Sequence, residues 1–245
     1  MASNQISLNP NSIARVLAAV AFLLVVASTG WQIAAYMTGH EYIYGLVPLF
    51  YLDAEQNIPT FFSSFLLLFA ALLLLVITVL ERNQAAARVS HWAVLSCGFF
   101  FMAIDEFISL HERLMEPTRR LLGGGDLGIF CFAWVIPGIA LILVLAPFFV
   151  KFLWRLPAKT RLTFVVAAII YIGGCIGFDI IGGAYASGYG THNLTYSMIA
   201  TVEESLEMAG VIIFIRGLLV YICDNYKEVR FRIEGTSGQA KSGEP

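Results

Sequence analysis

Six long apolar segments alternate with short polar stretches along the chain. They cover roughly residues 12–37, 60–80, 91–112, 128–154, 162–186 and 196–223. An α-helix rises ~1.5 Å per residue, so ~20 apolar residues cross a hydrocarbon core ~30 Å thick. Each segment is therefore long enough for one crossing. The pattern predicts an all-α fold, a polytopic membrane protein with six transmembrane helices.

Composition agrees with this pattern. Hydrophobic residues make up 58% of the 245 residues and charged residues 13%, and the mean hydropathy is +0.77. These values exclude an ordinary soluble domain, so the expected partner is the lipid bilayer and not nucleic acid. No connection is long enough for a separate domain, and we expect one membrane domain over residues 1–223. The polar sequence of residues 224–245 predicts a disordered tail.

The distribution of Lys and Arg predicts the orientation. Positive residues are retained on the cytoplasmic side of a membrane. If both termini are cytoplasmic, eleven basic residues lie on the inner side and three, Arg113, Arg119 and Arg120, lie on the outer side. We therefore expect both termini in the cytoplasm. Tyrosines crowd the first outer loop, as is typical of an aromatic belt at the membrane interface.

With this orientation, the acidic residues near or inside the apolar segments converge on the outer leaflet. They come from the sequences DEFISLHE, TVEESLE, FYLDAEQNIPT and CIGFDIIGG. An ionised carboxylate at the centre of a membrane helix costs ~2.5–3.5 kcal/mol, so these groups need partners. The candidate polar cluster comprises Asp53, Asp105, Glu106, His111, Glu112, Asp179, His192, Glu203, Glu204 and Glu207.

Three arrangements would accommodate these acids: a bound metal cation, protonated carboxyls that hydrogen-bond one another, or a water-filled cavity. Salt bridges alone do not suffice, because only Arg113 lies near their level and Arg216 lies deeper. Glu203 and Glu207 share a helix face at i and i+4, where like charges repel. That repulsion favours a cation between them.

A metal site is the first hypothesis. Carboxylates with one or two imidazoles suit iron, manganese or zinc. Its predicted ligands are Asp105, Glu106, His111, Glu112, Glu203 and Glu207, with Glu204 as a catalytic acid for proton transfer. If the third helix continues to residue 112, Asp105, Ser109 and Glu112 lie on one stripe, and Glu106 and His111 cannot both face it. Acids that merely face the interface, or that form a proton or ion pathway, remain alternatives.

Several familiar signatures are absent from the sequence. No Glu-x-x-His pair, HExxH or Walker loop is present, so a ferritin-like oxidase, a zincin and a nucleotide-binding protein are not supported. Asp53 is interpreted as a cap for the second long helix, with a place in the cavity as the alternative. The four cysteines have no CxxC spacing and are interpreted as packing residues.

The blocks FYLDAEQNIPTFFSS, AIDEFISLHERL and VEESLEMAG, spread from about residue 50 to 210, resemble a family of largely uncharacterised bacterial multipass membrane proteins. That family carries YLDxExNIPT, DEx4HE and EExxEMxG blocks. The resemblance implies that the polar blocks, including Glu55 and Asn57, belong together. It also implies the inner (plasma) membrane of a bacterium.

We therefore expect a membrane protein with an outer-leaflet site for a divalent metal, which would act on a lipid-soluble or periplasmic small molecule if the protein is an enzyme. A proton- or cation-coupled transporter is the first alternative. An accessory subunit of a membrane complex is the second. A homo-oligomer or a larger complex is compatible with each.

Overall fold

The computed structural model describes residues 9–40, 42–84, 89–125 and 127–226. Within these ranges the chain is helical and contains no strand. Six helices are long and apolar enough to cross a membrane. They are α1 (Pro10–Thr38), α3 (Ile58–Asn83), α4 (Val89–Ile108), α6 (Val135–Trp154), the continuous α7 to α8 segment (Ala158–Tyr189) and α9 (Leu194–Asn225). The predicted number of apolar spans is confirmed.

Short elements connect the long helices. They are η1 (Ile43–Gly45), α2 (Leu46–Phe50), η2 (Glu112–Leu114), α5 (Met115–Leu121), η3 (Gly128–Phe130) and the π-helical η4 (Gly173–Phe178), which joins α7 (Ala158–Ile172) to α8 (Asp179–Tyr189). The third span ends at Ile108 and not at Glu112, so that prediction was wrong by one turn. The predicted tail lies, from residue 227 onward, outside the described residues.

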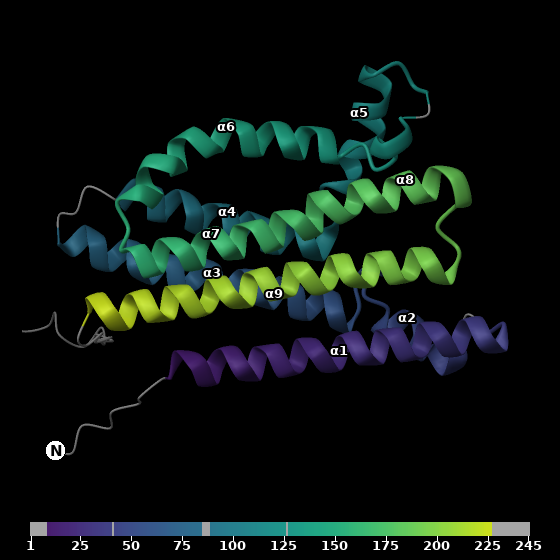
Figure 1. Ribbon diagram of the computed structural model, residues 1–245, viewed down its shortest axis with the longest axis horizontal. Helices are drawn as coiled ribbons and strands as arrows, with labels where there is room; N and C mark the ends of the chain where they lie inside the picture. The colour runs from purple at the N-terminus through teal and green to yellow at the C-terminus, as the bar shows by residue number, and fades with distance from the viewer. Residues whose placement is uncertain (1–8, 41, 85–88, 126, 227–245) are drawn as a thin grey trace, which may run out of the picture.

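Helix α9 lies at the centre of the bundle and packs against α1, α3 and α7. Leu66 and Leu74 of α3 meet Ile215 and Leu218 of α9 in an apolar core, where all four side chains are fully buried. Figure 1 shows that α1 begins and α9 ends at the same end of the bundle, here called the terminal end. The opposite end, which carries α2, α5 and the turn between α8 and α9, is called the distal end.

Two glycines allow α7 and η4 to approach α9 closely. A Cβ atom on Gly210 would lie 2.8 Å from both the Cβ and the backbone nitrogen of Tyr171. A Cβ atom on Gly174 would lie 3.0 Å from the carbonyl oxygen of Glu203. Small residues permit such backbone contact between membrane helices. This contact presses η4 against the acidic turns of α9.

Helices α4 and α6 are joined by aromatic rings at the terminal end. The His91 ring stacks on Phe148, with centroids 4.4 Å apart, and on Phe152, at 5.0 Å. Trp92 is fully buried and meets Phe152 edge-on at 4.9 Å. Towards the distal end, α6 runs as an arch along the upper edge of the bundle in Figure 1.

Candidate functional site

A cavity of about 800 Å³ occupies the distal half of the bundle, between α4, α6, η4 and α9. Nine carboxyl groups line it, whereas His111 and Arg113 are the basic groups that its lining includes. The carboxyls belong to Asp53, Glu55, Asp105, Glu106, Glu112, Asp179, Glu203, Glu204 and Glu207. Nine of the ten residues of the candidate polar cluster thus lie around one cavity. The tenth, His192, is exposed in the turn before α9 and is not part of the lining.

Helix α9 supplies the largest share of the acidic wall. Asn193 caps the helix, because its Oδ1 accepts a hydrogen bond from the backbone nitrogen of Tyr196 at 3.0 Å. Glu203, Glu204 and Glu207 follow within the next turns, and all three are half-buried. Electrostatic interactions link Glu106 on α4 to Glu204 and Glu207. Carboxyls from two helices therefore face one another across the cavity.

The end of α4 brings His111 back onto Asp105. Ser109 has a positive φ of 53°, which stops the helix after Ile108 and turns the chain. The backbone nitrogen of His111 then donates to Asp105 Oδ1 at 2.8 Å, and its Nδ1 lies 3.0 Å from Asp105 Oδ2. The predicted stripe of residues 105, 109 and 112 was wrong for this reason. Glu106 and His111 both line the cavity.

His111 is held beside several negative charges. Burial of its ring lowers the pKa, but the hydrogen bond and the charge of Asp105, together with Glu112 and Glu106, outweigh burial and raise it above its ordinary value. The imidazolium form is therefore favoured. The ring also lies tilted against Trp134, with centroids 4.8 Å apart.

Asn57, not Asp53, caps α3. Its Oδ1 accepts a hydrogen bond from the backbone nitrogen of Thr60 at 3.1 Å, and its Nδ2 donates to the carbonyl of Tyr51 at 2.6 Å. Asp53 lines the cavity instead. The capping interpretation of Asp53 was wrong because the amide of Asn57 already satisfies the start of the helix.

Asp53 accepts a hydrogen bond from the Tyr51 hydroxyl, which lies 3.0 Å from its Oδ2. Its side chain is accessible, but the accessible surface faces the cavity, where protein excludes most bulk water. This desolvation is the main cause that raises the pKa of Asp53 to about 6. Negative charge on Glu112 and Glu55 raises the pKa further, whereas the Tyr51 hydrogen bond lowers it.

We expect the Asp53 carboxyl to titrate near pH 6, above its ordinary pKa of 3.8. The Tyr51 hydroxyl stabilises the ionised form, so Tyr51→Phe should move the midpoint to higher pH. Isotope-edited infrared spectroscopy of ¹³C-aspartate protein measures this, with the Asp53→Asn spectrum subtracted to isolate the band. A midpoint that stays unchanged or moves to lower pH in Tyr51→Phe would contradict this prediction.

Sequence analysis missed several cavity residues. Tyr171, Cys175, Trp134 and Tyr196 all line the cavity. The Asp179 carboxyl lies at hydrogen-bonding distance from the Glu203 carboxyl and the Trp134 indole. Aromatic residues and cysteine within apolar runs are typical of a packed core, so their sequence pattern carried no signal. Cys175, interpreted as a packing residue, reaches the cavity on the π-helical turn, a feature often found at functional sites.

Among the described residues, no group of three or more His, Cys, Asp and Glu side chains is arranged to hold a metal ion. Asp105 and His111 bind each other instead. The remaining acids surround the cavity without converging on one point. A cation would therefore have to draw side chains of α4 and α9 together.

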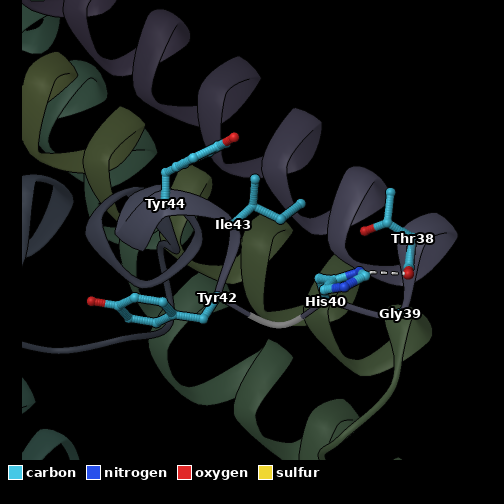
Figure 2. Close-up of a pocket in the computed structure, with 6 residues that line it drawn as sticks. All are labelled: Thr38, Gly39, His40, Tyr42, Ile43 and Tyr44. Carbon is cyan, nitrogen blue, oxygen red and sulfur yellow. Dashed lines mark hydrogen bonds between the residues drawn. The ribbon is translucent and has the colours of Figure 1, made fainter.

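A second hollow, of about 730 Å³, lies at the distal end of α1. Figure 2 shows Thr38, Gly39, His40, Tyr42, Ile43 and Tyr44 around it, with Tyr42 and Tyr44 pointing in different directions. His40 Nδ1 lies 2.8 Å from the carbonyl oxygen of Thr38. Tyr42 and Tyr44 are exposed at 74% and 94%, as expected of aromatic side chains at a membrane interface.

Comparisons with known proteins give one match. No curated protein and no solved structure matches the chain. A family model described as "Domain of unknown function (DUF8692)" matches residues 16–222, which include all six apolar spans except a few terminal residues and every residue that lines the acidic cavity. The chain therefore belongs to the DUF8692 family.

Proposed function

We propose that the acidic cavity binds a divalent metal cation, iron, manganese or zinc, and that the protein is a metal-dependent membrane enzyme. The observation that carries this proposal is the charge imbalance: nine carboxyls, with one arginine and one histidine, surround a single cavity inside the bundle. Glu106 of α4 and Glu203 and Glu207 of α9 are the principal ligands. Oxygen ligands of this kind suit hard and borderline divalent cations.

The energetics support a cation. Two like charges 4 Å apart repel by about 4 kcal/mol at an effective dielectric constant of 20. Arginine does not relieve this repulsion on α9, because the Arg216 Nε donates to Asn11 Oδ1 at 2.8 Å, away from the cavity. A divalent ion placed between Glu203, Glu207 and Glu106 would neutralise the repulsion and also provide the convergence that the side chains lack without it.

The other cavity residues have distinct roles in this proposal. Glu204 transfers a proton to or from the substrate. The Asp105 and His111 pair supplies a fixed imidazolium near the distal rim. When bound, the metal would act as a Lewis acid or a redox centre. The substrate is a small molecule that comes from the bilayer or from the compartment facing the distal end.

The distribution of basic residues supports a cytoplasmic location for the termini and an outward-facing distal end. The motif resemblance supports a bacterial inner membrane. Towards the terminal end, Met208, Val211 and Ile215 of α9 continue into the buried apolar core. This favours a binding site that is open towards one side of the membrane over a transport pathway through the bundle.

Elemental analysis of the purified full-length protein tests the proposal. We expect about one iron, manganese or zinc ion per chain, removed by dialysis against EDTA and restored by adding back the same metal. Protein purified without immobilised-metal chromatography is required, so that column metal does not contaminate the count. Less than a tenth of an equivalent of each metal, before and after the addition, would refute the proposal.

A further inference from the structure

The acidic cavity also has an apolar wall, which faces away from α9. Helix α4 contributes Phe101 and Met102, which lie one turn before Asp105 and Glu106. Helix α6 contributes Pro137, Gly138, Leu141 and Ile142. Since residues at i and i+4 lie on the same face of a helix, each apolar side chain of α4 lies directly below an acid. The cavity is therefore polar at the distal end and apolar towards the middle of the bundle.

This apolar wall reaches the outer surface of the bundle. Phe101 is 57% exposed and Leu141 is 58% exposed, although both line the cavity. Both belong to helices that are apolar enough to cross a membrane, so lipid chains surround their exposed surfaces. The aromatic stack of His91 with Phe148 and Phe152 joins α4 to α6 at the terminal end. Phe101 and Leu141 lie nearer the distal end and form the rim of an opening between the two helices.

We propose that the cavity opens sideways to the bilayer between the distal halves of α4 and α6, and that it binds a long-chain aliphatic amine through this opening. The hydrocarbon chain lies along Phe101, Met102 and Leu141. The ammonium head lies beside Asp105 and Glu106. This goes beyond the proposed function, because it assigns a ligand class and a route and requires no bound metal.

Charge complementarity identifies the head group. Nine carboxyls against one arginine and one histidine attract a cation and repel phosphate or carboxylate heads. The chain contributes little selectivity, because lipid tails are as apolar as the helix wall and leaving them brings no hydrophobic gain. Ligands with the same chain and different heads should therefore differ in affinity according to head charge. The volume, about 800 Å³, is ordinary for a site that holds a small ligand.

The binding experiment uses the full-length protein in phosphatidylcholine nanodiscs with EDTA present. The probe is a nitroxide-labelled octadecylamine, and its immobilised fraction is measured by electron paramagnetic resonance. Labelled octadecanol and labelled stearate serve as matched probes. We expect the amine to bind at least tenfold more tightly than stearate, with the alcohol between them. Equal immobilisation of amine and stearate, or no immobilised amine, would overturn the proposal.

A pair of variants tests the route. Leu141→Trp fills the opening and should reduce immobilised amine about tenfold. Leu143→Trp is the control, because Leu143 also lies on α6, is 67% exposed and does not line the cavity. Phe101→Trp provides a second test from α4 if Leu141→Trp lowers the yield of folded protein. An equal loss in Leu143→Trp, or no loss in either rim variant, would contradict entry between α4 and α6. Since EDTA is present throughout, failure here leaves the metal count unaffected, and a negative metal count leaves this result unaffected.

Discussion

Replacing both Glu203 and Glu207 by glutamine is expected to abolish stoichiometric metal binding and to leave the bundle folded. The two residues lie at i and i+4 on α9 and line the cavity. Glutamine keeps the volume of each side chain and removes its charge. Like charges at this spacing destabilise a helix by a few tenths of a kcal/mol, so the metal-free variant should be as stable as the metal-free wild-type protein or slightly more stable.

The measurement is thermal unfolding with and without metal. A ligand at 100 times its dissociation constant stabilises the folded state by about 2.7 kcal/mol, so the wild-type melting temperature should rise when metal is added. The melting temperature of the double variant should not change. Glu116→Gln is the matched control, because Glu116 lies on α5, pairs with Arg120 at 2.8 Å and is exposed. Stabilisation of the double variant equal to that of the wild-type protein would contradict the assignment of these ligands.

The membrane spans were predictable because their signal is long and depends little on tertiary contacts. An apolar run of twenty residues is inserted for the cost of transferring its side chains, so its length alone identifies it. Helix ends are different. Ser109 adopts a positive φ that is uncommon for any residue other than glycine, and the sequence DEFISLHE contains neither glycine nor proline. Only the contact of Asp105 with both the backbone and the ring of His111 explains this turn.

The acidic side of the site was also predictable, for an energetic reason. A carboxyl in an apolar run must have a compensating environment, so Asp105, Glu106, Glu203 and Glu207 could be grouped before any geometry was known. His192 was grouped by its level in the membrane alone. The structure places it on the surface of the turn before α9. Level along a helix axis does not determine the direction in which a loop side chain points.

The apolar side of the site was not predictable. Trp134 and Tyr171 lie within apolar sequence and differ from core residues only in the space that they face. The π-helical turn at η4 shifts the facing of Cys175 and Asp179 relative to a regular helix. Periodicity at 3.6 residues per turn cannot reveal such a shift, because one extra residue in a turn leaves the composition unchanged.

Gly210 ends the VEESLEMAG block, and its packing gives that glycine a physical reason. A Cβ atom there would lie 2.8 Å from the Tyr171 backbone nitrogen and 3.0 Å from the Ala167 carbonyl oxygen. Both are backbone atoms, which cannot rotate away as a side chain can. Glycine therefore sets the separation of α7 and α9, and with it the position of Tyr171 on the cavity wall.

Gly210→Ala is consequently expected to destabilise the bundle. Overpacking of a close contact typically costs about 1–3 kcal/mol, and relief here requires α7 and α9 to move apart. Gly98→Ala on α4 is the matched control, since a Cβ atom on Gly98 meets nothing within 4 Å. Alanine is a better helix former than glycine by about 0.8–1.0 kcal/mol in peptides, so the control should be neutral or slightly stabilised.

The free energies of unfolding of both variants can be compared in the same detergent, by thermal or denaturant titration followed by circular dichroism. Because the contact lies next to Tyr171, the separation of α7 and α9 should also widen the cavity, and the Gly210→Ala variant should lose metal affinity even where it remains folded. Glu203 and Glu207 lie on α9 itself, so they move together with Gly210, whereas Tyr171 and Cys175 move with α7 and η4. If Gly210→Ala is as stable as Gly98→Ala, then α7 and α9 do not pack as closely in the membrane as in this structure, and the wall of the cavity that η4 forms must be placed elsewhere.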